Sequence, residues 1–185
     1  GIDEVSEPLD QAMLLSLAEV VRGATVAFNG YDHTKALELA EQFFWGFTDD
    51  YLELVKERAY NAEGKYSAAQ QASAAIALRR ALHVLLRLFA PFLPFATDEV
   101  WSWWQVGAGS IHRAAWPVAE ELTEGLDASN AALLQLASQA VSGVRKAKSD
   151  AKVSMKAVVE SATAVPVVTA VSSVFNPGPL ESASS

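Results

Sequence analysis

Apolar residues recur at every third or fourth position along most of the chain, which is the period of an amphipathic helix. The first such stretch covers residues 8–28. The second begins after Tyr31, with Asp32 as its N-cap, and stops at the polar segment 61–64. Gly46 lies inside this second stretch and should loosen it. The stripes that these two helices should bury are Leu14, Leu17, Val21, Ala24 and Phe28, and then Leu37, Ala40, Phe44, Phe47, Tyr51 and Leu54.

A third helix is predicted to open at Ser67, because Gln70 stands three residues further on and completes a capping-box pattern. Pro91 and Pro94 should end it, since proline cannot continue a helix. A short helix over 95–105 is predicted to follow. The buried stripe of the third helix should consist of Ala75, Leu78, Leu82, Leu85 and Phe89.

The remainder of the helical region is less regular. Residues 110–116 are expected to be extended, and the acidic segment 120–129 is expected to be a loop. Asp127 or Ser129 can cap a last long helix that continues to about Lys148. Its buried line should be Leu133, Leu136, Ala140 and Val144.

The character of the chain changes after Ser149. Residues 152–168 are rich in Val, Ala, Ser and Thr, which favours one or two strands. Residues 171–185 are rich in Ser and Pro without periodicity, and we expect a flexible tail. The predicted organisation is a helical domain over 1–148, the start of a small, partly β module over 149–170, and the tail over 171–185.

These elements predict an all-α fold, an up-and-down antiparallel helical bundle with a small extended C-terminal appendage. Each long helix has one apolar stripe and the connections are short, so neighbouring helices should pack antiparallel. At 185 residues with 51% hydrophobic content, the chain is long enough for one domain with a full core.

Composition narrows the functional classes. The formal net charge is −8. The chain has no cysteines, and this excludes disulfides and thiolate metal sites. An acidic average counts against nucleic-acid binding, although the distribution of charge matters more than its sum. No apolar run approaches the ~18 residues of a membrane span. We therefore expect a monomeric cytoplasmic protein that does not bind a membrane.

Two groups of basic residues stand out against this acidic background. Arg79, His83 and Arg87 follow at intervals of four, so they share one face of the third predicted helix. They could bind phosphates, or they could pair with carboxylates of a neighbouring helix.

The second group comprises five positive residues interrupted only by Asp150, which gives a local charge of +4. Such a reversal favours an RNA contact. The alternative is a solvated helix end stabilised by the helix dipole. The residues of this group are Arg145, Lys146, Lys148, Lys152 and Lys156.

Five tryptophans are many for one domain. Exposed aromatic rings can stack on unpaired RNA bases, although most tryptophans belong to a core. Trp45 and Trp104 are the first candidates for stacking, because their neighbours already supply the predicted core. Catalytic patterns are weak, since the three histidines are scattered without metal-ligand spacing. No catalytic or metal-binding residue is predicted.

Three segments carry a family resemblance. Residues 43–56, FFWGFTDDYLELVK, resemble the second bundle helix of class I aminoacyl-tRNA synthetases for branched aliphatic amino acids. Residues 88–101, LFAPFLPFATDEVW, resemble the helix–proline–helix junction of that family. Residues 110–117, SIHRAAWP, are similar to the segment that follows its bundle. The first segment looks most like the valyl form, with isoleucyl and leucyl enzymes as alternatives.

The resemblance covers about residues 8–156 and implies an anticodon-binding domain that docks the anticodon stem-loop of valine tRNA. The full-length enzyme would attach valine to its tRNA with ATP and magnesium. The family's catalytic His-x-Gly-His and Lys-Met-Ser-Lys-Ser motifs do not occur in this sequence. The resemblance thus implies an inactive fragment without cofactors, joined to a catalytic domain of the same polypeptide. A helical protein-interaction bundle without RNA binding is the alternative.

Overall fold

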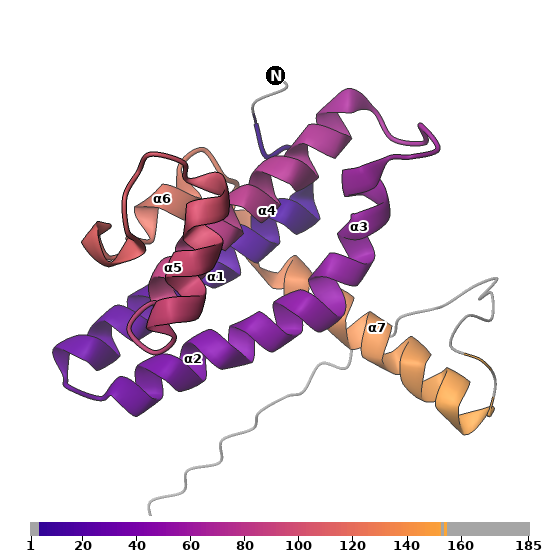
Figure 1. Ribbon diagram of the computed structural model, residues 1–185. Helices are drawn as coiled ribbons and strands as arrows, with labels where there is room; N and C mark the ends of the chain where they lie inside the picture. The colour runs from indigo at the N-terminus through magenta and orange to yellow at the C-terminus, as the bar shows by residue number, and fades with distance from the viewer. Residues whose placement is uncertain (1–3, 153, 155–185) are drawn as a thin grey trace, which may run out of the picture.

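The computed structural model describes residues 4–152 and 154, and every regular element among them is helical (Figure 1). η1 is a π-helical turn, while η2 and η3 are 3₁₀ turns. The elements are α1 (Pro8–Asn29), α2 (His33–Gly46), η1 (Phe47–Tyr51), α3 (Leu52–Tyr60), α4 (Ala68–Phe89), α5 (Pro94–Trp104), η2 (Ile111–Arg113), α6 (Glu120–Thr123), η3 (Ala128–Ala132) and α7 (Leu133–Asp150).

The predicted all-α helical bundle is confirmed. α1 is its central helix and contacts α2, α4, α6, η3 and α7. A turn over 30–32 folds α2 back along α1, and Asp32 caps α2 by accepting a hydrogen bond from the Lys35 amide at 2.9 Å. The expected C-terminal appendage, including the strands over 152–168 and the tail over 171–185, lies outside the described residues apart from its first few positions.

α1 buries the stripe that its periodicity predicts. Leu14, Leu17, Val21 and Ala24 are buried, and Phe28 packs against the same core. By length and composition α1 could also cross a membrane, although the sequence suggested no such span. In the fold it is the core helix of the bundle, because other helices surround its apolar stripe.

The second predicted helix is interrupted by a π-helical turn directly after Gly46. A π turn inserts one extra residue, so the apolar stripe shifts in phase. Tyr51 is buried as predicted, but the next buried positions are Val55 and Arg58. The prediction of Leu54 as a core residue is wrong, since its side chain is 41% exposed.

The predicted stripe of the third helix is confirmed at Leu85, and Leu78 and Phe89 pack partly buried against the core, but the centre of the buried face lies about one position earlier. α4 opens with the expected capping box between Ser67 and Gln70. However, Ala75 is exposed and Leu82 is 40% exposed. Small side chains allow α4 to approach α1 closely, so alanines occupy the contact. The buried line is Ala74, Ala77, Ala81, Val84 and Leu88.

The segments after α5 differ from the prediction. Residues 110–116 contain a 3₁₀ turn, η2, because Asp98 accepts hydrogen bonds from the Ser110 hydroxyl and the Ile111 amide at 2.7 and 2.9 Å. The segment 120–129 contains α6 and the start of η3, and Asp127 caps η3.

α7 extends to Asp150 and has no buried residue. Its predicted buried line is wrong, since Leu136 is 50% exposed and Ala140 is exposed. Leu134 instead packs against the main core. The first part of α7 crosses the bundle, and its C-terminal part extends beyond the other helices (Figure 1).

A buried carboxylate joins the helices. Asp10 is fully buried in α1 and accepts hydrogen bonds from Tyr51 Oη, Ser73 Oγ and both terminal nitrogens of Arg58, each at 2.7 Å. Burial, followed by the charge of Asp10, raises the pKa of Tyr51 far above its ordinary value, so its hydroxyl remains a donor. The hydrogen bond to Asp10 raises the pKa of Arg58, against the effect of its burial. This Asp10 cluster ties α1 to η1, α3 and α4.

We predict that Arg58→Ala lowers the free energy of unfolding by about 3–5 kcal/mol, because it leaves the charge of Asp10 buried without its cationic partner. Urea denaturation followed by far-UV circular dichroism measures this. Lys56→Ala is the control, since the exposed pair of Lys56 with Glu53 should contribute about 0–1 kcal/mol. Equal losses in the two variants would contradict a central role for the cluster.

Candidate nucleic-acid interface

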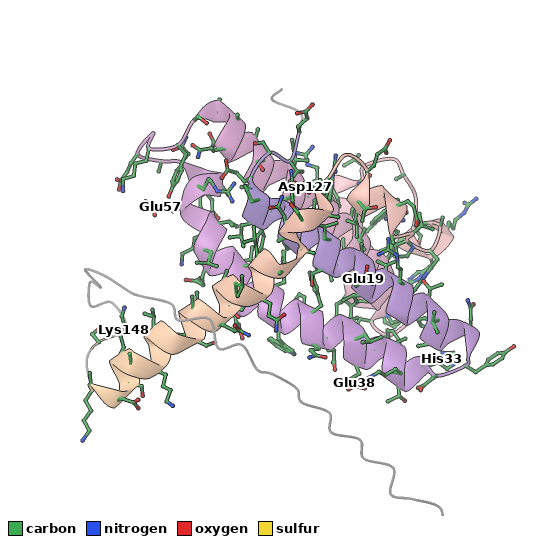
Figure 2. All side chains as sticks on the ribbon, turned by 180° about the vertical axis from the view of Figure 1, so that it is seen from behind. Glu19, His33, Glu38, Glu57, Asp127 and Lys148 are labelled. Atoms are coloured by element: carbon green, nitrogen blue, oxygen red, sulfur yellow. The ribbon has the colours of Figure 1, made fainter. Side chains whose placement is uncertain are left out.

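The C-terminal turns of α7 carry most of the second basic group. Lys146 is exposed on α7, and Lys152 is exposed in the turn after it, where its φ of 53° is left-handed. Neither has an ion-pairing partner within the part of the chain that the structure describes. Lys148 is partly buried, and Figure 2 shows it near the far end of α7. Lys156 lies outside the described residues.

Arg145 differs from its basic neighbours because it contacts the bundle. Its Nη1 donates to Asp50 Oδ1 at 2.8 Å, and its Nη2 donates to the Asp49 carbonyl oxygen at 2.6 Å. Both acceptors belong to the π turn η1. The guanidinium therefore fixes α7 on the bundle, while its side chain remains 45% exposed. Asp50 thus has a structural role in the contact between η1 and α7.

An open groove of about 790 Å³ runs beside this contact on α7. Its lining combines apolar and basic side chains of α7 with one acidic residue of α3. This combination suits a polyanion, because the basic side chains can bind phosphates. The lining residues are Glu53, Ala140, Val141, Val144, Arg145, Lys146, Lys148 and Ser149.

The first basic group does not form one free surface. Arg87 is buried, with Nη2 at 2.5 Å and Nη1 at 3.2 Å from the carboxylate oxygens of Glu121. Its hydrogen bond lowers the pKa of Glu121. Burial, followed by the charge of Arg87, lowers the pKa of His83. Arg87 therefore pairs with a carboxylate of a neighbouring helix, the second of the two interpretations of this group, and joins α4 to α6. Arg79 is exposed and unpaired among the described residues.

The two candidate tryptophans have different surroundings. Trp45 is 60% exposed on α2, where its ring makes a T-shaped contact with the ring of Phe44. Trp104 is partly buried in a small cluster with His83 and Trp101. Its Nε1 is enclosed and has no hydrogen-bond partner among the described residues. Most of the Trp45 ring is thus accessible to solvent, whereas the ring of Trp104 packs against His83 and Trp101.

The structure therefore brings together Arg145, Lys146 and Lys148 on one helix, with Lys152 just beyond. Arg79 and Trp45 belong to other helices. Sequence reasoning did not identify Arg145 as the partner of Asp50, because the two residues are 95 positions apart in the chain. No group of three or more His, Cys, Asp or Glu side chains within residues 4–152 could hold a metal ion.

Residues 10–163 match the model of the family described as the anticodon-binding domain of tRNA ligase. This chain belongs to that family. The anticodon-binding domain thus comprises the whole described bundle, from Asp10 in α1 to the basic end of α7, and the match continues beyond the described residues.

Close relatives of this anticodon-binding domain have the name valine–tRNA ligase. The protein from Thermobifida fusca is 57% identical over 159 residues, which is 86% of this chain and 17% of the relative. The protein from Salinispora tropica is 53% identical over 173 residues, with 86% and 20% covered. The protein from Leifsonia xyli is 50% identical over 159 residues, with 86% and 18% covered. The chain spans about a fifth of the length of these relatives.

We predict that Arg145→Ala increases amide hydrogen exchange throughout α7, because the helix loses its ion pair with η1. A partly exposed pair should change the local opening free energy by roughly 0.5–1 kcal/mol. Lys146→Ala is the matched control and should leave exchange unchanged. Unchanged exchange in Arg145→Ala would show that apolar contacts alone hold α7 in place.

Proposed function

We propose that this domain binds the anticodon stem-loop of valine tRNA as one part of a longer valine–tRNA ligase. The family match over residues 10–163 carries the proposal. The names of its relatives favour valine over isoleucine or leucine. The basic end of α7 supplies the physical means of contact with RNA in a protein whose net charge is −8.

Phosphate contacts are assigned to α7 and the turn that follows it. The lysine ammonium groups of Lys146, Lys148 and Lys152 are point charges on flexible stems, which bind backbone phosphates without reading sequence. Arg145 positions these lysines, because its ion pair with Asp50 holds α7 on the bundle. The exposed part of its guanidinium is a further phosphate contact. We also assign Lys156 to the phosphate contacts. Arg79 is a separate phosphate contact on α4.

Base contact is assigned to Trp45. Anticodon bases are unpaired, so an aromatic side chain can stack on a base that has left the helical stack of the loop. The indole ring of Trp45 is largely exposed and makes a T-shaped contact with the ring of Phe44. Trp104 and Arg87 are not part of this proposed surface. Trp104 packs inside the bundle, and Arg87 is paired with Glu121.

The longer enzyme would attach valine to its tRNA using ATP and magnesium, and we propose that it acts as a cytoplasmic monomer. We assign no step of that reaction to this chain, whose residues form the bundle and its basic helix. Its contribution is to bind the anticodon end and hold the tRNA in register with the catalytic domain.

A protein-interaction bundle remains the competing function, because the chain as a whole is acidic, with a net charge of −8. The two functions differ in their response to salt. RNA binding through phosphates releases counterions and weakens steeply as salt increases. Docking through apolar surface is much less sensitive to salt.

The deciding experiment measures binding of this chain to valine tRNA, isoleucine tRNA and valine tRNA with a swapped anticodon, each at two salt concentrations. We expect preference for the intact valine anticodon and weaker binding at higher salt. Equal binding to all three would reject anticodon recognition by this chain. Salt-independent binding would reject the role of the basic end of α7.

We predict that replacing Lys146, Lys148 and Lys152 together by alanine weakens binding to all tRNAs by similar factors. The slope of log K against log salt should decrease by about 1 for each phosphate that the variant no longer binds. Filter binding or fluorescence anisotropy across a salt series measures the slope. A triple variant of Lys35, Lys56 and Lys65, which pair with glutamates elsewhere, is the control and should leave the slope unchanged.

We predict that Trp45→Ala weakens binding to valine tRNA by about 1–3 kcal/mol, because a stacked base loses its platform. Trp45→Phe should retain part of the affinity, since a smaller aromatic face remains. Tyr31→Ala serves as the control, because Tyr31 is 86% exposed in the turn between α1 and α2. Equal affinity of the wild type and Trp45→Ala would remove Trp45 from the interface.

A further inference from the structure

α5 carries large apolar side chains on its outer side as well as on its inner side, with Glu99 and Ser102 beside the outer ones. Its inner side packs Trp101 against Leu86, Ala90 and Ile111. Its outer side presents Phe95, which is 90% exposed, and Trp103, which is 68% exposed. The outer side of a surface helix is usually polar, so two large exposed aromatic side chains on this side of α5 are unusual.

The exposed apolar surface continues past both ends of α5. Leu93, just before the helix, is 53% exposed, and Val106, just after it, is 87% exposed. Together with Phe95 and Trp103 they form what we call the α5 face. Several large exposed apolar side chains on and beside one short helix favour an interaction site, whereas single exposed ones are ordinary.

The chemistry of the α5 face favours a protein partner over RNA. α5 carries Asp98 and Glu99 and no lysine or arginine, so it would repel phosphates. Trp103 Nε1 donates to Glu99 Oε1 at 3.1 Å, which satisfies the indole within the helix. Exposed tryptophan and phenylalanine without basic neighbours on the helix resemble the centre of a protein interface.

The α5 face lies on the opposite side of the bundle from the basic helix. α5 is in front of α1 and α4 in Figure 1, whereas α7 is in front in the reverse view of Figure 2. A partner on the α5 face would therefore leave the end of α7 accessible to RNA.

We propose that the α5 face is covered by the rest of the longer polypeptide, through an apolar surface of that polypeptide. This inference rests on the proposed function, in which the chain is one domain of an enzyme about five times its length. To hold the tRNA in register, that enzyme needs a fixed geometry between its domains. A flexible link would lower the effective concentration of one domain at the tRNA after another domain has bound. A packed apolar interface supplies the fixed geometry.

Hydroxyl-radical footprinting of the complete polypeptide and of this chain, both without tRNA, tests the proposal. Phe95 and Trp103 should be oxidised several-fold more slowly in the complete polypeptide. Trp45 and Tyr60, which are 60% and 80% exposed elsewhere on the bundle, are internal controls and should react at equal rates in both. Equal rates at Trp103 in the two samples would overturn the proposal.

Two further outcomes would assign the α5 face to another occupant. If Trp103 is already oxidised slowly in this chain alone, and this chain sediments as a dimer, the α5 face would be assigned to a second copy. Protection that requires tRNA would assign it to RNA. Because the main comparison contains no tRNA, failure of the anticodon-binding proposal would not change its result, and the two proposals can fail separately.

A double variant, Phe95→Ser with Trp103→Ser, provides a second measurement. Both side chains are exposed, so the melting temperature of this chain should stay the same. In the complete polypeptide, oxidation of Leu93 and Val106 should increase to the rates seen in this chain, because the interface opens. Tyr60→Ser is the matched control and should not change those rates. Continued protection of Leu93 and Val106 in the double variant would overturn a role for the two aromatic side chains in the interface.

Discussion

The carboxylate of Asp10 is the constraint on which the bundle depends. A charge buried in the centre of a helical core is unfavourable unless every lone pair has a donor. Here Arg58, Tyr51 and Ser73 supply four hydrogen bonds from three different parts of the chain. Apolar stripes alone would tolerate small rotations of the helices, whereas these directional bonds select one arrangement of α1, α3 and α4.

This arrangement extends to the proposed RNA surface through the π turn. Tyr51 must face Asp10, and the extra residue in η1 lets Arg58 reach the same carboxylate two turns later. The same turn presents Asp50 and the Asp49 carbonyl to Arg145. The position of α7, and with it the direction of its lysines, therefore follows from a buried interaction in the core.

The acidic average of the chain and its proposed RNA binding are compatible because the two kinds of surface are separated in space. Positive charge gathers at the C-terminal end of α7, where the helix dipole also favours it. Arg87, although basic, contributes to the bundle by pairing with Glu121. The opposite side carries the apolar α5 face. A domain that binds RNA on one side and protein on the other can hold the two in a fixed relation.

Interactions between residues that are near neighbours in the chain made part of this structure predictable. The period of apolar residues, the Asp32 cap and the capping box at Ser67 depend on neighbours within a few positions, so the long helices and the all-α class were predictable. The family resemblance rested on short motifs in the same way. Only the packing of the helices against one another determines which side of α4 is buried and that α7 is exposed. The same packing engages Arg87 with Glu121 and Trp104 with its neighbours, while Trp45 and Trp103 face solvent. Periodicity shows that a helix has an apolar side, but only the packed neighbours determine whether that side is covered.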